Sequence, residues 1–491
     1  MQFITPESAG ISSENILNYV KKLEDTRLCT HDIIIARKGK ILYEAYWKPF
    51  DKDFIHRMYS VTKSFVSLAI GFLVQEGKLS LDDTMEQHFA EELKNQKDEN
   101  MHKQTVRNML MMCTAKVAQW PFVPKCTDRV RFYFENDSAE SRPAGTIFQY
   151  DSSGSFVLCA LVERISGMTL MEYLRSRLFD KIGVSDSITC LKCRGGHSWG
   201  DSALICTPRD LLLVAQFVMN KGKWNGEQIL NEDYVTTATS KLIDNNFINN
   251  NEHNSQGYGY QFWRLFDNSF FFNGMGCQFA VCVPDKDIVF IYNADNQGMD
   301  YAKKVILDNF YDMIVRTASD EPLPENPAAK KELDDFSAQL KLKAAEGNIS
   351  SPMANVVNGK TFTMDENPMG ITKLKLCFDE NGGILYYTNA QGDKELTFGM
   401  CENRFGEFPQ DGYSDDIMDV PGNRRYKCAC SAAWVMPEKL VIKVQIIDKY
   451  FGNLHIHLGF TDDNQVGVFM IKTAEAFLDE YNGYAGGKIN N

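Results

Sequence analysis

The sequence predicts an α+β domain followed by an all-β domain, and three observations lead to this fold class. The chain has 491 residues, enough for about three domains at roughly 150 residues each. Hydrophobic residues make up 44% of the chain, so a large core is available. Helical and strand patterns alternate up to about residue 318, whereas from 359 to 472 apolar residues recur at every second position.

The first 318 residues combine an early hairpin, a series of helices and a group of late strands. The hairpin turns at Lys38–Gly39, and Ser12 or Ser13 is expected to cap the first helix. Helical patterns cover residues 13–23, 60–76, 157–165, 170–178 and 210–219, and strand patterns cover residues 32–47, 270–272, 278–284 and 288–295. The helix over 60–76 is apolar almost all round, which predicts that it is central and buried. We expect a sheet that joins both ends of this part and is flanked by helices.

The composition changes after residue 318. Residues 319–349 contain three prolines and then a charged helical pattern, which is typical of a linker followed by a bridging helix. Further on, Leu374 and Leu376 alternate with polar neighbours, and a turn at 381–383 follows. This pattern predicts an antiparallel barrel or sandwich. The predicted organisation is therefore a domain over 1–318, a linker with its helix over 319–349, and a β domain over 350–491.

Charge and composition exclude several classes of protein. Lys plus Arg number 52 against 65 Asp plus Glu, a net charge of −13, which argues against binding to nucleic acid or to an anionic membrane. The longest apolar stretch, residues 65–74, is too short to span a bilayer. No secretory signal is visible at the start of the sequence. The 13 cysteines are an odd number, so they cannot all form disulfides. We therefore expect a cytoplasmic protein with reduced thiols.

Ser60 and Lys63 are the candidate catalytic residues, in the only SxxK sequence of the chain. They lie one turn apart at the start of the predicted buried helix, and therefore on the same face. A serine hydroxyl is a strong nucleophile only when a base lies within hydrogen-bond reach, and an apolar helix can supply a desolvated lysine. The free amides of a helix N-terminus suit a developing oxyanion. The alternative is an N-cap serine beside an exposed lysine.

Two other patterns compete with SxxK as candidate sites. Residues 196–200 fit G-x-S-x-G, the nucleophile elbow of α/β-hydrolases, but no helical pattern begins directly after Ser198. A glycine-rich loop is the better interpretation there. His455 and His457 alternate on one strand, yet no third ligand is evident, so no metal or other cofactor is predicted.

Around SxxK the sequence resembles the serine β-lactamase/penicillin-binding-protein family, most closely its class C and esterase branch. The resemblance extends in order over roughly residues 3–310. It rests on the segments HRMYSVTKS (56–64), TVRNMLMMCT (105–114), PAGTIFQYDSSG (143–154), SALICTPRDL (202–211), YGYQFW (258–263) and NGMGCQ (273–278). The resemblance implies a β-lactamase/transpeptidase-like domain, in which an antiparallel sheet is flanked by helices and a helical subdomain.

The resemblance also implies roles for individual residues. Ser60 would be the acylated nucleophile and Lys63 its base, and Tyr150 would relay the proton to the leaving group. The amides of Ser60 and Met275 would form the oxyanion hole. Substrate would also meet Ser152, which replaces the usual asparagine, together with Phe272, Asn273 and Gly274 of the third motif.

Phe272 departs from the family in a way that bears on substrate. Relatives carry a cation there that helps to hold the carboxylate of β-lactams and of peptidyl-D-alanine, so its loss favours an uncharged ester or amide. Esterases, D-aminopeptidases and 6-aminohexanoate-oligomer hydrolases share the catalytic set without that cation. The first hypothesis is a serine hydrolase of a small ester, amide or peptide. The alternatives are a catalytically weak penicillin-binding-like sensor and a true β-lactamase or DD-peptidase, and self-association is left open.

Overall fold

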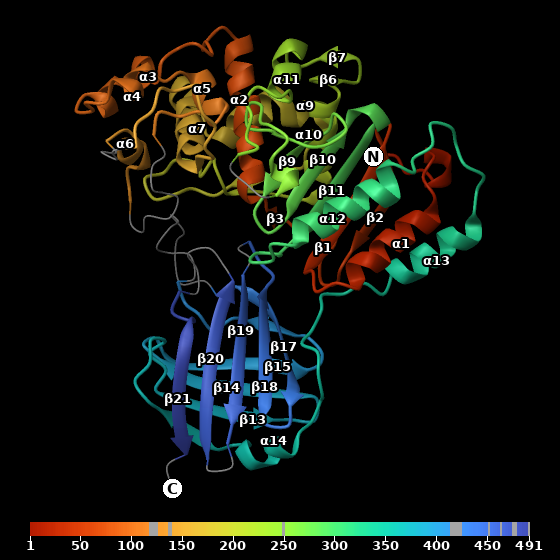
Figure 1. Cartoon of the computed structure of the whole chain (residues 1–491), viewed down its shortest axis with the longest axis vertical. Coiled ribbons are helices and arrows are strands. Elements are labelled where there is room, and N and C mark those ends of the chain that lie inside the picture. The colour runs from red at the N-terminus through yellow and green to blue at the C-terminus, as the bar shows by residue number, and fades with distance from the viewer. Residues whose placement is uncertain are drawn as a thin grey trace. The chain divides into compact units, whose positions relative to one another are not determined.

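The computed structural model describes residues 1–116, 126–135, 140–247, 251–412, 425–449, 452–461, 464–473 and 479–489 (Figure 1). The chain divides into two compact units. The first runs from Met1 to Lys341 and the second begins at Leu342. All 13 cysteines are free thiols.

The first unit is built on an antiparallel sheet that joins its two ends, as the sequence predicted. Among the described residues the sheet has six strands in the order β2-β1-β11-β10-β9-β8. The strands are β1 (Thr30–Arg37), β2 (Lys40–Tyr46), β8 (Trp263–Arg264), β9 (Phe270–Gly274), β10 (Gln278–Val283) and β11 (Ile288–Ala294). Pairing of β1 with β11 brings residue 32 opposite residue 293, so segments about 260 positions apart meet in the centre of the sheet.

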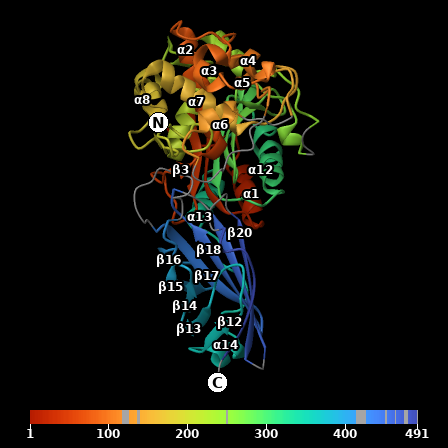
Figure 2. The ribbon, with the colours of Figure 1, turned by 90° about the vertical axis from the view of Figure 1, so that its left-hand side faces the viewer.

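Helices cover both faces of this sheet (Figure 2). On one face, α1 (Ser13–Glu24) and α12 (Ala302–Phe310) pack into a core with the odd-numbered residues of β10, such as Phe279 and Val281. On the other face, α10 (Pro208–Met219) contacts β1, β10 and β11. Ser12 caps α1, accepting a hydrogen bond from the Glu14 amide. The expected arrangement of a sheet flanked by helices is confirmed.

A group of helices forms a subdomain around α2 (Thr62–Gln75), which is buried along most of its length. The predicted helix over 60–76 therefore exists, but Ser60 lies in a 3₁₀ turn, Tyr59–Val61, and the α-helix begins two residues later. The other helices of this unit are α3 (Met85–Leu93), α4 (Glu99–Lys103), α5 (Val106–Leu110), α6 (Arg129–Phe134), α7 (Ser152–Ser166), α8 (Leu170–Leu174), α9 (Asp180–Ile182), α11 (Glu232–Ala238) and α13 (Pro327–Ser337).

Three small strands, β3 (His56–Arg57), β4 (Thr189–Cys190) and β5 (Leu204–Cys206), pair beside α2, and β6 (Lys223–Trp224) pairs with β7 (Glu227–Gln228). No single helix in the described ranges is long and apolar enough to cross a membrane. The two consecutive helices 152–166 and 170–182 are long and apolar enough only when they are counted together, and the chain bends by 67° between them.

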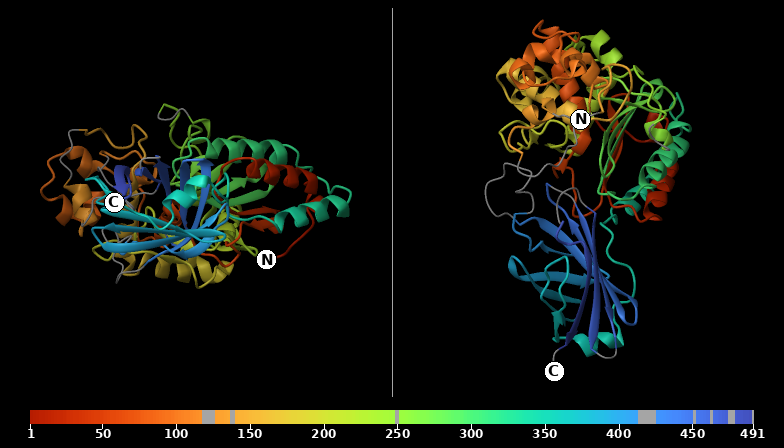
Figure 3. Two further views of the ribbon diagram at one scale, coloured as in Figure 1. Left: turned by 90° about the horizontal axis from the view of Figure 1, so that it is seen from below. Right: turned by 60° about the vertical axis from the view of Figure 1, so that its left-hand side comes forward.

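The second unit is a β-barrel, which decides between the barrel and the sandwich that the sequence left open (Figure 3). Nine of its described strands form a ring, closed by parallel pairing of Gly399 with Ser431, and β16 pairs with β17 outside the ring. The strands are β12 (Thr361–Met364), β13 (Lys373–Phe378), β14 (Gly382–Asn389), β15 (Gly392–Met400), β16 (Arg404–Glu407), β17 (Lys427–Met436), β18 (Lys439–Ile446), β19 (Asn453–Phe460), β20 (Gln465–Thr473) and β21 (Gly483–Ile489), with α14 (Pro352–Val357) before them.

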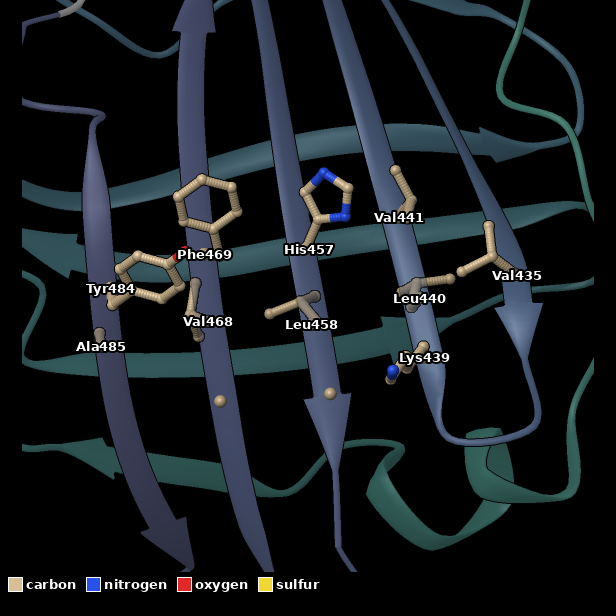
Figure 4. Close-up of a pocket in the computed structure, with 12 residues that line it drawn as sticks. Val435, Lys439, Leu440, Val441, His457, Leu458, Val468, Phe469, Tyr484 and Ala485 are labelled. Atoms are coloured by element: carbon tan, nitrogen blue, oxygen red, sulfur yellow. The ribbon is translucent and has the colours of Figure 1, made fainter.

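Alternate residues of the barrel strands face its core, as the two-residue period predicted. Leu440, Ile442 and Val444 of β18 are buried. Residues of β17 to β21 line a cavity of about 460 Å³ (Figure 4). Within it the rings of Phe469 and Tyr484 stack at 4.4 Å, and His457 lies 5.8 Å from Phe469. The ring of His455, on the same face of β19, lies 6.4 Å from that of His457.

Helix α13 packs on α1 within the first unit, beyond the change of composition at residue 318. Leu333 is fully buried there. The Lys21 ammonium lies 3.0 Å from the Glu332 carboxylate, and the hydroxyls of Tyr43 and Ser337 are 2.9 Å apart. The first unit therefore continues to Lys341, past the predicted linker boundary.

Replacing Leu333 by Ala tests this docking of α13. Because the side chain is fully buried, its truncation should cost about 2–5 kcal/mol of unfolding free energy. Urea titration followed by tryptophan fluorescence measures the loss, with Lys331→Ala on the exposed side of the same helix as the control. Equal midpoints for the two variants would show that α13 does not stabilise the unit.

Candidate active site

Ser60 and Lys63 lie side by side at the start of α2. The Lys63 Nζ donates to the Ser60 Oγ across 3.0 Å. The spacing of three residues places the two side chains on one face of consecutive turns. Lys63 is 2% exposed because α2 is the buried helix of the subdomain, whereas Ser60 keeps partial contact with solvent. The two polar atoms are therefore close enough to exchange a proton, and the serine is partly open to solvent.

The residue before Ser60 has an unusual backbone. Tyr59 has a φ of 47°, in the left-handed region that bulky residues rarely occupy. Two neighbours hold its ring: the Arg57 guanidinium lies 4.4 Å above it, and Gln297 donates to its hydroxyl at 3.4 Å. Strained backbone of this kind persists where the surroundings hold it in place, and it is common at functional sites. The turn sets the orientation of Ser60.

Lys63 has a second partner that sequence reasoning missed. Its Nζ donates to the backbone carbonyl of Asp201 at 2.6 Å. The Asp201 carboxyl is 1% exposed, and neither of its oxygens accepts a hydrogen bond from the described residues. Burial raises its pKa, while the nearby charges of Lys63, Arg129 and Arg57 act in the opposite direction. Since a backbone carbonyl makes the contact, no side-chain motif marks this position.

Tyr150 also lies close to Lys63. It directly precedes Asp151, the N-cap of α7, so the helix start fixes its backbone. The Lys63 Nζ is 5.1 Å from the centre of the Tyr150 ring, and that ring stacks on Trp263 at 5.5 Å. Ser152 is the first residue of α7 and is half-buried. The structure thus brings three of the predicted residues, Ser60, Lys63 and Tyr150, into one cluster.

Strand β9 carries the predicted third motif. The Phe272 side chain is fully buried and packs edge-on against Phe65 and Phe262, so it belongs to the core beneath the site. Gly274 lies against the turn that holds Ser60: a Cβ placed on it would come within 2.4 Å of the Met58 carbonyl oxygen. Only glycine allows this approach of strand and turn.

Two backbone amides remain available beside the serine. The amides of Val61 and Thr62 donate within the 3₁₀ turn, whereas that of Ser60 has no backbone acceptor in the described part of the chain. The amide of Met275, directly after Gly274, likewise has no backbone acceptor among the described residues. The Met275 side chain is exposed. Free N–H groups on two adjoining segments can bind one oxyanion.

The other candidate sites are less suited to chemistry. Ser198 is buried in the loop between β4 and β5, and a strand rather than a helix follows it. In the described residues, Glu252, His253 and Asp308 form one group with the spacing of metal ligands. The Lys304 ammonium lies 2.9 Å from Glu252 and 2.7 Å from Asp308, so a cation already compensates both carboxylates.

Comparison with known proteins identifies the family. The model of the Beta-lactamase family matches residues 32–308, more than half of the 491. The chain belongs to the beta-lactamase family. The match includes the Ser60–Lys63 turn, Tyr150 and strand β9, so all of the clustered residues lie inside the beta-lactamase domain.

Individual relatives of this beta-lactamase-family chain are distant. The 6-aminohexanoate-dimer hydrolase of Paenarthrobacter ureafaciens is 24% identical over 236 residues, which span 44% of this chain and 58% of that protein. A Bacillus anthracis structure with the provisional name 6-aminohexanoate-dimer hydrolase has a TM-score of 0.52 and 20% identity, over 62% of this chain and 83% of that one.

A third relative matches both units. The octameric penicillin-binding protein homologue from Pyrococcus abyssi has a TM-score of 0.50 and 15% identity, and the match covers 97% of this chain and 99% of that one. At this identity the likeness shows the fold: a β-lactamase/transpeptidase-like domain followed by a β-barrel.

Gly274→Ala tests the contact between β9 and the Ser60 turn. The added Cβ would lie 2.4 Å from a backbone oxygen, so the strand must move away from the turn. A shift near 1 Å at a reacting centre can lower turnover by about 100-fold. Ester hydrolysis measures the effect, and Gly406→Ala, where nothing lies within 4 Å of the new Cβ, is the control. Unchanged turnover in Gly274→Ala would contradict a tight requirement for glycine.

Asp201→Asn tests the cost of the buried carboxyl. The folded protein raises the pKa of Asp201, so the folded state holds this proton more tightly than the unfolded state does. Wild-type stability should therefore fall as pH rises above the unfolded pKa of about 3.8. The asparagine variant lacks this loss and should gain stability over wild type between pH 4 and 7. Urea titrations across that range measure the difference, with Asp186→Asn, fully exposed, as the control. A pH-independent difference would contradict the prediction.

Proposed function

We propose that the chain is a serine hydrolase that cleaves an ester or amide through an acyl-enzyme on Ser60. The observation that carries the proposal is the 3.0 Å hydrogen bond between the Lys63 Nζ and the Ser60 Oγ at a partly exposed helix start. A serine hydroxyl needs a base at this distance to attack a carbonyl carbon. Membership of the beta-lactamase family, a family of serine hydrolases, supports the assignment.

In the acylation step, Lys63 as the free amine takes the Ser60 proton while Oγ bonds to the substrate carbonyl carbon. The carbonyl oxygen becomes an oxyanion, which the amides of Ser60 and Met275 stabilise. Collapse of the tetrahedral intermediate breaks the bond to the alcohol or amine, and Tyr150 delivers the proton that this leaving group requires. Lys63, 5.1 Å from the Tyr150 ring, restores the proton to the tyrosine.

Deacylation reverses the same transfers. Water gives a proton to Lys63, directly or through Tyr150, and attacks the acyl carbon; Lys63 then returns the proton to the Ser60 oxygen as the acid is released. The scheme requires no metal or other cofactor. Hydrogen bonding of Lys63 to the Asp201 carbonyl keeps the amine aimed at Ser60 through both steps, so Asp201 is a positioning residue.

Amides of linear amino acids fit this scheme as a substrate class. The 6-aminohexanoate-dimer hydrolase is a curated relative, although the chain spans only 58% of its length. Such substrates are small and flexible, and their scissile amide matches the proposed acyl transfer. Simple esters, whose leaving groups depart more readily, should be turned over by the same residues.

Ser60→Ala should abolish ester hydrolysis and covalent labelling, because the acyl-enzyme cannot form without the hydroxyl. The loss of turnover is expected to be about 10⁴-fold or more, as when a catalytic nucleophile is removed. A panel of p-nitrophenyl esters and 6-aminohexanoate dimer measures turnover. Mass spectrometry of the protein treated with a fluorophosphonate locates the label.

Lys63→Met and Ser198→Ala separate the possible outcomes. Lys63→Met should slow labelling of Ser60 while leaving the fold intact by circular dichroism, and Ser198→Ala should behave as wild type. Labelling at Ser198 would contradict the assignment. Labelling of Ser60 without turnover of any substrate would instead indicate a sensor that is acylated and not released.

A further inference from the structure

One buried glutamine connects the helices that carry the catalytic candidates. Gln261 lies in the turn that precedes β8 and is 2% exposed. The Ser64 hydroxyl of α2 donates to its backbone carbonyl at 2.7 Å, and the Ser155 hydroxyl of α7 donates to its side-chain oxygen, also at 2.7 Å. Helices α2 and α7 pack against each other (Figure 1). Gln261 therefore bonds to both helices near their N-terminal ends.

The two serines lie close in the chain to the catalytic candidates. Ser64 directly follows Lys63 in the first turn of α2. Ser155 lies in the first turn of α7, the helix whose start fixes the backbone of Tyr150. Hydrogen bonds between successive turns make a helix rigid, so a contact in the first turn also fixes the neighbouring residues. The two bonds to Gln261 thus act on the segments that carry the lysine and the tyrosine.

The side-chain amide of Gln261 bonds to a third element, α5. Its Nε2 donates to the backbone carbonyls of Met109 and Leu110 at 3.1 and 3.0 Å. These carbonyls belong to the C-terminal end of α5, where the helix itself supplies no partner for them. The glutamine therefore fixes the end of α5 as well.

The chain that leaves α5 holds the residues on both sides of Tyr150. The Met112 carbonyl accepts a hydrogen bond from the Gln149 amide at 2.8 Å, and the Met112 Sδ accepts one from the Asp151 amide at 3.1 Å. Any shift of the end of α5 would therefore be passed on to the tyrosine between them.

Gln261 has a backbone conformation that few glutamines adopt. Its φ is 63°, in the left-handed region that favours glycine. Such a conformation persists where the surroundings hold it in place. Here its backbone amide also donates, to the Leu110 carbonyl at 3.0 Å, so that every hydrogen-bonding group of the residue has a partner. A residue bonded in this way holds its three neighbouring elements in one arrangement.

The two distances within the site have different origins. Ser60 and Lys63 belong to one helix start, so α2 alone sets their separation. Tyr150 comes from another segment, and its distance from Lys63 depends on contacts between elements. Gln261 makes such contacts, and Trp263, two residues further on, stacks on the Tyr150 ring at 5.5 Å.

We propose that Gln261 is a positioning residue that sets the distance between Tyr150 and Lys63. The inference rests on the proposed hydrolase activity and concerns one of its steps. As the bond from the acyl carbon to the leaving atom breaks, the Tyr150 hydroxyl gives its proton to that atom. Lys63, which holds the proton taken from Ser60, then reprotonates the tyrosine. An alkoxide or an amine needs this proton, whereas p-nitrophenolate leaves without it. Gln261 therefore determines how well the site expels a poor leaving group.

Two esters of one acid separate this step from the attack of Ser60. Ethyl butyrate and p-nitrophenyl butyrate form the same acyl-enzyme, and of the two leaving groups only the ethoxide requires a proton. Their kcat/KM values report acylation, so the deacylation step that they share does not enter the comparison.

Gln261→Met removes the side-chain hydrogen bonds and keeps a side chain of similar length. It should lower kcat/KM for ethyl butyrate by about 100-fold, the effect of a shift near 1 Å at a reacting centre. Because Ser60 and Lys63 stay together, kcat/KM for p-nitrophenyl butyrate should fall by less than about 5-fold. Equal losses for the two esters, or no loss for either, would overturn the proposal.

Ser155→Ala is a milder variant that keeps the proposal testable if Gln261→Met does not fold. It removes only the bond between the glutamine and α7. The ratio of kcat/KM for p-nitrophenyl butyrate to that for ethyl butyrate should rise by about 5- to 10-fold, as for the loss of one neutral hydrogen bond. An unchanged ratio would contradict the role of this contact.

Gln96→Met is the matched control in the same unit. Gln96 is also buried, and its side chain bonds to the backbone of Phe134, Lys97 and Asp98. Its replacement removes as many hydrogen bonds away from α2 and should leave the ratio of the two kcat/KM values unchanged. A rise as large as in Gln261→Met would show that lost stability causes the effect, and would reject the positioning role.

A crystal structure of Gln261→Met tests the geometry without turnover. The Lys63 Nζ should remain 3.0 Å from the Ser60 Oγ, whereas the Tyr150 ring should lie farther from Nζ than the present 5.1 Å. A ring at its original distance would reject the positioning role even if wild type hydrolyses both esters. A displaced ring in a protein whose wild type hydrolyses no ester would support the positioning role and contradict the hydrolase assignment.

Discussion

The two hydrogen bonds of Lys63 are the constraint on which the rest of the site depends. The amine lies in a buried helix, where a polar group without partners costs several kcal/mol. The Ser60 hydroxyl and the Asp201 carbonyl both accept hydrogen bonds from it. Each contact fixes a different segment: the 3₁₀ turn before α2 and the loop before β5. The Tyr150 ring lies 5.1 Å from the same nitrogen.

The cluster of Ser60, Lys63 and Tyr150 also depends on strand β9, which the sheet holds against the turn of Ser60. Glycine at position 274 lets the strand touch the carbonyl of Met58, so the amide after it lies beside Ser60. Phe272, one step back on the strand, anchors β9 in the aromatic core of the subdomain with Phe65 and Phe262. Packing and strand pairing thus hold Gly274 against the turn that contains Ser60, although about 215 positions separate the two residues in the chain.

Much of the fold followed from periodicity, because helices and strands that bury one face leave a regular pattern. The hairpin turn at Lys38–Gly39, the buried helix after Ser60 and the closing strands of the sheet are of this kind. Closure of the barrel did not follow, since it depends on Gly399 meeting Ser431 across two distant strands. The 3₁₀ turn at Ser60 was also missed, because the unusual φ of Tyr59 has no glycine to signal it.

The same limit applies to charge at the site. A motif records side chains that are neighbours in sequence, so the absence of a cation at Phe272 was visible and the presence of Lys303 was not. The lysine reaches β9 from a helix that follows the last sheet strand, and only the packing of α12 on Phe271 and Phe279 places it beside Asn273. The acidic net charge of −13 is distributed over the whole chain and acts at long range. The Lys303 ammonium acts at hydrogen-bond distance on Asn273 and Asn254, and it is the packing of α12, rather than the overall charge balance, that decides these contacts.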